Sequence, residues 1–224
     1  MKPRNRSEML LLSLALAGGF VDVASYIGLG KVFTANMTGN TVLFGVALAK
    51  GSGADAIRAA TALGGFCLGG ALGMVLIPQE HRGWPRTVLR PLLLESVSLA
   101  ALLVLWAAIG AQSIRSLLVV IAGVAMGSQS AAVRVSDVRG VNTTFMTSTL
   151  LNAIELLVHK ARGIPAARDA PNLPGAAWLT YGGGAVAGAF AVDAWDAGVI
   201  AVPLAIVAVV SGIAFRENRR LAHP

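Results

Sequence analysis

The stretch KVFTANMTGNTVLFGVALAKG, residues 31–51, places five amide and hydroxyl side chains at the front of an otherwise apolar segment. The polar run ends at Asn40 and Thr41, and the residues that follow are apolar as far as Ala49. This pattern predicts the start of a short helix, in which Thr38 or Asn40 caps the free backbone N–H groups. Gly39 tolerates unusual dihedral angles and lets a backbone or a solute come close.

The composition around this stretch is that of a membrane protein. The chain has 224 residues, of which 55% are hydrophobic and 13% charged, and its mean hydropathy is +0.70. Soluble proteins are roughly one quarter charged. The net charge of +7 comes mainly from short loops and tails, which follows the positive-inside rule and argues against nucleic-acid binding. We therefore expect an all-α polytopic membrane protein with one membrane domain, residues 1–224.

The apolar periodicity divides the chain into eight helical segments, and two of these are short and begin with polar residues. The predicted segments are 8–30, 38–50 (short), 55–77, 88–109, 115–133, 145–159 (short), 174–192 and 197–215.

The chain also contains an internal repeat signal. A shift of 109 residues superposes the Met-Thr pair at 37–38 on the Met-Thr pair at 146–147, and it also pairs Thr34 with Thr143. We therefore expect two repeats, residues 8–110 and 115–216 approximately.

Two topologies are compatible with these segments. If all eight cross, the repeats are parallel. If the two short helices dip into the membrane and return, six helices cross and the repeats are inverted. The second arrangement leaves only Lys31, Lys50, Arg58 and Arg115 of the 18 basic residues on the outer side. It fits the positive-inside rule better and puts both termini in the cytoplasm.

Small residues mark predicted contacts between helices. Gly65, Gly69 and Gly73 follow one another at intervals of four, as do Gly184 and Gly188. Glycines at this spacing let helix backbones approach closely in a membrane. We expect packing seams at these positions.

Two carboxylates fall inside predicted spans, where an ionised group is costly. Asp22 is either a functional residue or a structural one that is satisfied by a donor such as Lys31 or Arg134. For Glu95 the expectation is likewise divided between a functional residue and an interfacial one that reaches the lipid headgroups.

The second short helix carries a polar stripe. Ser148, Asn152, Glu155 and His159 follow at spacings of four, three and four, which is one helical face. Such a face meets another helix or a water-filled path, where a Glu–His pair relays protons. The alternative is a solvated helix end beside Lys160.

These features favour a transporter or channel for a small solute or ion, with its site where the two polar helix starts approach each other near the membrane midplane. The expected pathway residues are Asp22, Asn36, Thr38, Gly39, Asn40, Gln129, Asn142, Thr147, Asn152 and Glu155. A non-transporting scaffold or regulatory subunit is the alternative. An enzyme is less favoured, because neither a paired nucleophile and base nor a nucleotide-binding motif is present. We expect no metal and no cofactor; the expected partners are the lipid bilayer and an unidentified solute, and a homo-oligomer is left open.

Two stretches resemble a known family. GGFVDVASYIGLGKVFTANMTGNTVLFGVAL (18–48) closely resembles the signature of the bacterial YoaK-like membrane proteins, a domain-of-unknown-function family. MGSQSAAVR (126–134) followed by NTTFMTSTL (142–150) resembles the signature of the second half of that family, except that Thr-Ser-Thr at 147–149 stands where the family pattern has Thr-Gly-Thr. The resemblance implies a multi-pass inner-membrane protein of roughly six spans, and it implies no particular substrate.

Overall fold

The computed structural model describes residues 3–78, 84–136, 146–164 and 172–222, and this part of the chain is helical, with no strand. Its elements are α1 (Pro3–Gly28), α2 (Met37–Ala49), α3 (Gly53–Val75), α4 (Leu89–Ile109), α5 (Arg115–Val135), α6 (Met146–Ala161), α7 (Leu173–Trp195), the 3₁₀ turn η1 (Asp196–Ile200) and α8 (Ala201–Ala222).

Helix length separates two kinds of element. Within the described residues, α1, α3, α4, α5, α7 and α8 each have 21 to 26 residues, which is long enough to cross a bilayer. The apolar stretch Leu173–Arg220 has 48 residues and contains α7, η1 and α8, so it is long enough for two crossings. α2 and α6 have only 13 and 16 residues. The predicted all-α polytopic membrane fold is confirmed.

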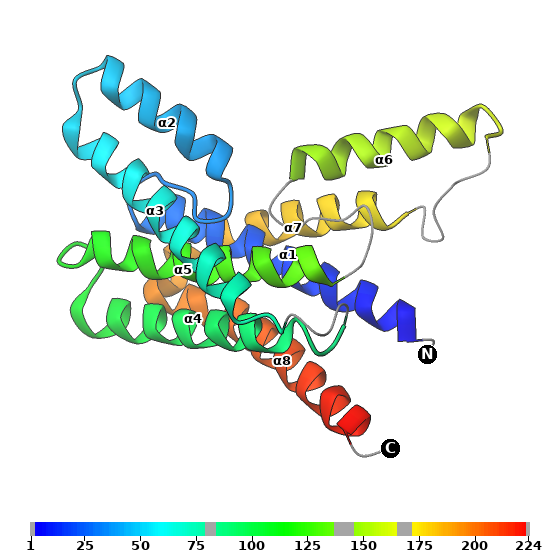
Figure 1. The fold of residues 1–224 in the computed structure, drawn as a ribbon. Coiled ribbons are helices and arrows are strands. Elements are labelled where there is room, and N and C mark those ends of the chain that lie inside the picture. Colours follow the sequence, from blue (N-terminus) through cyan, green and yellow to red (C-terminus); the bar gives the residue numbers. More distant parts are fainter. Residues whose placement is uncertain (1–2, 79–83, 137–145, 165–171, 223–224) are drawn as a thin grey trace.

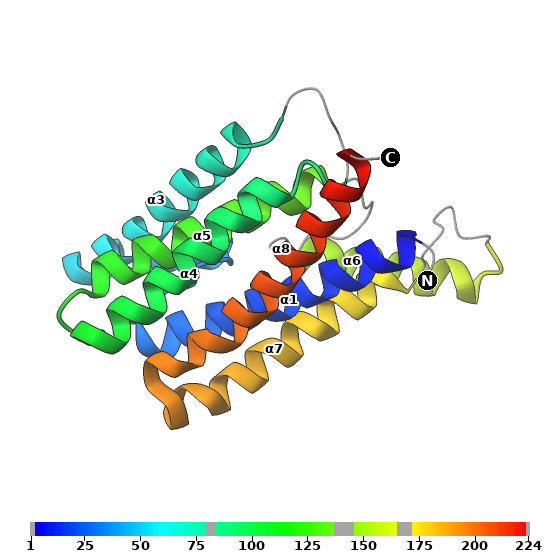
Figure 2. The ribbon, with the colours of Figure 1, turned by 90° about the horizontal axis from the view of Figure 1, so that it is seen from below.

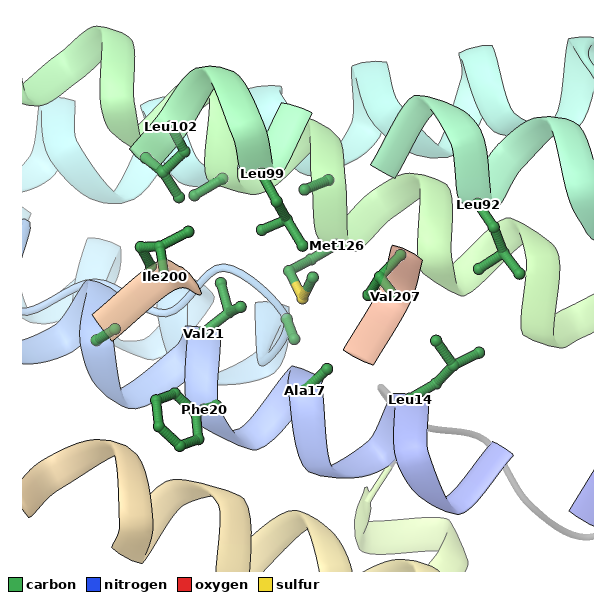
Figure 3. Packing of buried hydrophobic residues seen from close by; sticks show 14 of the residues in the cluster. Leu14, Ala17, Phe20, Val21, Leu92, Leu99, Leu102, Met126, Ile200 and Val207 are labelled. Carbon is green, nitrogen blue, oxygen red and sulfur yellow. The ribbon is translucent and has the colours of Figure 1, made fainter. Parts of the chain in front are cut away.

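The core lies between four of the long helices. Leu14 and Val21 of α1, Leu99 of α4 and Met126 of α5 point into it together with Val207 of α8 (Figure 3). All five side chains are buried. α3 packs on the outside of α5, and α7 packs on the outside of α1. α2 in turn packs on α3, and α6 packs on α7, so the two short helices lie outermost (Figure 1).

The α3–α5 contact is built on glycine. A Cβ atom on Gly65 would lie 2.8 Å from the Val120 carbonyl oxygen, and one on Gly69 would overlap the Val124 carbonyl. On Gly73 it would lie 2.7 Å from the Cβ of Ala131. The two backbones therefore touch directly, which brings dispersion contacts that a larger side chain would prevent.

The α1–α7 contact uses the same device. A Cβ on Gly184 would overlap the Leu16 carbonyl, and one on Gly188 would lie 2.6 Å from Cγ1 of Val23. From the opposite helix, Gly19 faces the Tyr181 carbonyl in the same way. These two glycine contacts hold α3 against α5 and α7 against α1, the two inner helices.

α4 and α8 run antiparallel, and three polar contacts link these two helices or the segments next to them. The Trp106 indole donates to Asp196 Oδ1 at 3.1 Å, the Ser96 and Ser211 hydroxyls lie 3.4 Å apart, and the Trp84 indole donates to Glu217. Both termini consequently lie at the same end of the bundle (Figure 2).

The observed helix ends differ from the predicted ones mainly at the two termini. α1 begins at Pro3 rather than at residue 8, and α8 continues to Ala222 rather than ending at residue 215. The added turns carry charged residues, because a helix that has already been nucleated in the membrane continues into water at little cost.

Candidate functional site

The chain reverses direction immediately after α1. The backbone N–H of Leu29 donates to the Ser25 carbonyl, and that of Lys31 donates to the Tyr26 carbonyl, both at 2.9 Å. Gly30 and Lys31 have φ angles of 101° and 60°, in the left-handed region. Glycine reaches this region without a steric penalty, so Gly30 is well suited to the turn.

The turn is enclosed by two arginine side chains from other helices. A Cβ atom on Gly30 would lie 3.1 Å from the Cδ of Arg58 and 3.1 Å from the Cδ of Arg115. Arg58 itself is paired with Asp55 one turn earlier on α3. The end of α1, the start of α3 and the start of α5 therefore meet at one end of the bundle.

Asp22 holds the returning chain against α1. Its Oδ1 atom accepts hydrogen bonds from the backbone N–H groups of Thr34 at 2.7 Å and Ala35 at 2.6 Å. Its Oδ2 atom accepts a hydrogen bond from the Tyr181 hydroxyl of α7. The donors are therefore backbone groups and a phenol, whereas the sequence suggested Lys31 or Arg134.

Contacts on both sides of this carboxylate fix the same segment. The hydroxyls of Ser25 and Thr34 lie 3.2 Å apart, and both residues are fully buried. The rings of Tyr26 and Phe33 stack with their centroids 5.0 Å apart. Successive residues of the returning chain thus lie against successive residues of α1.

Asn40 completes the attachment from the other direction. Its Oδ1 atom accepts from the Phe33 backbone N–H at 2.9 Å, and its Nδ2 atom donates to the Phe33 carbonyl at 2.6 Å. Asn40 is fully buried. One side-chain amide therefore satisfies both backbone polar groups of Phe33, which would otherwise lack partners in an apolar environment.

α2 starts directly after this segment. Asn36 is its N-cap, and its Oδ1 atom accepts from the Gly39 backbone N–H at 3.2 Å, so the cap is Asn36 and not Thr38 or Asn40 as the sequence suggested. Gly39 lies against the Phe33 ring, which a Cβ atom would approach to 3.0 Å. Asn36 and Thr38 are exposed.

These contacts define the depth of the α2 start. Asp22 lies six residues before Gly28, the last residue of α1, which is roughly 9 Å along the helix axis at ~1.5 Å per residue. Because Thr34 and Ala35 bind Asp22, the chain has returned that far before α2 begins. α2 then runs outward again to its turn into α3 (Figure 1).

The predicted pathway residue Gln129 has a separate environment. It is fully buried in α5, and its Nε2 atom donates to the Leu14 carbonyl of α1 at 3.2 Å. This contact ties α5 to α1 at a level two turns of α1 away from Asp22. Gln129 therefore bridges the two inner helices.

The second polar helix start is described only from Met146 onward. Thr147 and Glu155 of α6 are exposed, Asn152 is half-buried, and Asn142 lies outside the described residues. α6 packs on α7 alone, and α2 and α6 share no contact among the described residues. Because residues 142–145 lie outside the described part, the joint site of the two helix starts stays a prediction; both short helices start near the middle of the molecule and run outward to opposite ends (Figure 1).

Two further polar residues lie outside the set of pathway residues expected from the sequence. Tyr181 donates to Asp22 across a separation of 159 residues, and no sequence spacing indicates such a contact. Glu95 of α4 is 0% exposed, so the expectation that it reaches the headgroups is wrong. The signal for Glu95 was its place within an apolar run.

No group of three or more His, Cys, Asp or Glu side chains converges to a metal-binding arrangement in the part of the chain that the structure describes. The contacts at the start of α2 are instead hydrogen bonds between uncharged groups and one carboxylate. Chemically, this arrangement can orient backbone N–H groups and present two exposed polar side chains.

Comparison with known proteins agrees with the membrane fold. The family model described as "Protein of unknown function (DUF1275)" matches residues 10–213. The chain is 36% identical over 149 residues to a protein of Bacillus subtilis (strain 168) described as "UPF0700 transmembrane protein YoaK", and the match covers 65% of each chain, just under two thirds of that relative. No solved structure matches. The resemblance carried by residues 18–48 and 126–150 is confirmed, and the chain belongs to the DUF1275 family of membrane proteins.

Proposed function

We propose that this protein is a bacterial inner-membrane transporter or channel for a small solute or ion, built from two inverted repeats. The observation that carries the proposal is the placement of exposed Asn36 and Thr38 at the level of Asp22, inside a span. Exposed amide and hydroxyl groups at that depth are unfavourable against lipid. A water-filled path beside the first turn of α2 accounts for them.

The pattern of helix packing supports the inverted repeat. In an inverted repeat, helices α1, α2, α3 and α4 correspond to α5, α6, α7 and α8. The contacts follow this correspondence: α3–α5 is matched by α7–α1, α2–α3 by α6–α7, and α4–α5 by α8–α1. α4 and α8 are equivalent helices of the two halves, and they pack on each other as an antiparallel pair. Each half has three long helices, an odd number, so equivalent helices cross in opposite directions, as in many transporters.

The half-length helices support a role in transport. α2 starts at the level of Asp22, with the positive end of the helix dipole at the path, and such ends favour anionic or electron-rich groups. With six crossings, 14 of the 18 basic residues lie on the side of the two termini. That side is accordingly the cytoplasmic one.

The structure also determines which substitutions test the proposal. Asp22 and Asn40 hold the returning chain, so replacing either one would confound transport with folding. Thr38→Val removes a hydroxyl in the first turn of α2 and conserves side-chain shape. Thr61→Val is a matched control, because the Thr61 hydroxyl bonds within α3 to the Ile57 carbonyl.

The experiment is a swelling assay with the purified full-length protein in liposomes, read by light scattering with a panel of small polyols, amino acids and alkali-metal salts. We expect at least one solute to enter faster than in empty liposomes. For that solute, Thr38→Val reduces the rate roughly tenfold, about 1.4 kcal/mol, whereas Thr61→Val leaves it unchanged. Equal rates in loaded and empty liposomes for every solute would contradict transport and favour the scaffold.

A further inference from the structure

Glu95 is an ionisable group that the fold buries without a partner. It lies in the second turn of α4 on the face that also carries Leu92, Leu99 and Leu102. Its side chain is 0% exposed, and neither carboxyl oxygen has a hydrogen-bond partner among the described residues. In this respect it differs from Asp22, whose oxygens accept three hydrogen bonds.

Among the residues that the structure describes, no cation is placed to neutralise this carboxyl. α3, α5, η1 and α8 pack against α4, and their charged residues in the described part of the chain lie at or near the helix ends. These residues, with the one on α4 itself, are Asp55, Arg58, Arg90, Arg115, Arg134, Asp196, Arg216, Glu217, Arg219 and Arg220. The residues between Arg115 and Arg134 on α5, and from Ala201 to Phe215 on α8, carry no charge.

An ionised carboxylate is not stable in these surroundings. Burying one without a counter-ion or hydrogen bonds costs many kcal/mol, so the packing accommodates Glu95 only as the neutral acid. The neutral acid has no hydrogen bond here either, so it contributes nothing to holding α4 in place. A buried polar group that costs stability and makes no hydrogen bond is typical of a functional position.

Hydroxyl groups lie close to Glu95 on α4, and one of them contacts α8. The next residue, Ser96, has its hydroxyl 3.4 Å from that of Ser211 on α8. Ser98, one turn beyond Glu95 on the same helix, is also buried. Hydroxyls of this kind hydrogen-bond to water when the two helices separate, whereas the surrounding leucines do not.

We propose that Glu95 is a proton-binding site of the membrane core. The carboxyl binds one proton while α4 is packed against α5 and α8. When α4 and α8 separate, the O–H bond breaks, the electron pair stays on the carboxylate, and a water molecule accepts the proton as hydronium. The release step rests on the proposed transport function, because alternating access supplies the separation of the helices.

Proton binding is tested by infrared spectroscopy on the purified full-length protein in lipid nanodiscs at neutral pH. We expect a carboxylic-acid C=O band that is lost in Glu95→Gln and retained in Asp193→Asn, which removes an exposed carboxyl on α7. Glu95→Met serves as a second variant, since an apolar side chain in place of a buried charge is commonly tolerated. Identical carboxylic-acid bands in the wild type and in both Glu95 variants would overturn the proposal.

Proton release is tested in liposomes with a solute found by the swelling assay. An imposed proton gradient is expected to accelerate wild-type flux roughly tenfold and to leave the flux of Glu95→Gln unchanged. Equal acceleration of both would overturn the coupling. If the wild type moves no solute, the proposed transport and the release step fail together, and the infrared band alone decides whether Glu95 holds a proton.

Discussion

At the scale of single residues, the polar side chains of the 31–41 stretch serve mainly the backbone. A segment that turns back into a membrane takes its N–H and C=O groups away from water, and each one left without a partner costs free energy. Asp22 satisfies the N–H groups of Thr34 and Ala35, and Asn40 satisfies both polar groups of Phe33. The polarity of the stretch is therefore first a condition for the chain to reverse.

This account predicts that Asn40→Ala destabilises the protein. Removing the amide leaves the N–H and C=O of Phe33 without their partners, which costs about 2–3 kcal/mol in total. Asn40→Asp is expected to cost at least as much, because an ionised carboxylate at this fully buried position repels the Phe33 carbonyl oxygen. Thermal unfolding in detergent measures both, and Thr41→Ala, an exposed neighbour, is the control with an expected change within ~0.5 kcal/mol. A stability of Asn40→Ala equal to that of the control would refute the role of Asn40.

At the scale of elements, the helices are held by seams in which glycine decides the distance between axes. α3 and α7 each carry adjacent glycines with different surroundings. Gly65 and Gly184 touch the backbone of another helix, whereas a Cβ on Gly64 or Gly183 would meet nothing within 4 Å. Close contact between two helices therefore depends on which face of the helix a glycine occupies. The number of glycines in a helix does not show which face makes the contact.

The element scale yields a paired prediction. Gly184→Ala forces the α7 backbone away from the Leu16 carbonyl and is expected to lower the free energy of unfolding by roughly 1–3 kcal/mol. Gly183→Ala adds a methyl group to open space and is expected to be neutral or to stabilise α7 by up to about 1 kcal/mol. Thermal unfolding of the two variants side by side provides the measurement, and similar losses in both would argue against the seam.

At the scale of the whole molecule, six of the described helices are long enough to cross a bilayer, and the two short ones each pack on one long helix of their own half. The return of the chain after Gly28 places Lys31 and Lys50 at the same end of the bundle, because α2 starts at the level of Asp22 and runs back outward. If α2 crossed the membrane, these two lysines would lie on opposite sides.

Cysteine accessibility distinguishes the two topologies. In a Cys67→Ser background, Lys31→Cys and Lys50→Cys are both expected to react with a membrane-impermeant maleimide added to intact cells. A cysteine in place of exposed Arg90 is expected to react only after the membrane is opened. Protection of Lys50→Cys together with labelling of Lys31→Cys would mean that α2 crosses.

Much of the architecture was predictable from the sequence because it depends on local properties. Spans follow from runs of apolar residues, the start of α2 from a cluster of capping residues, and the seams from glycines four residues apart, since each of these signals lies within one or two helical turns. The charge distribution also favoured six crossings over eight.

The partners of the buried polar groups were decided only by the tertiary structure. Tyr181 reaches Asp22 because α7 packs on α1, and Glu95 loses all contact with water because α5 and α8 enclose that face of α4. Hydrogen bonds and burial of this kind depend on how distant helices pack against one another. A sequence read along the chain contains the polar groups, whereas the packing determines which of them are satisfied and which, like Glu95, are left without a partner.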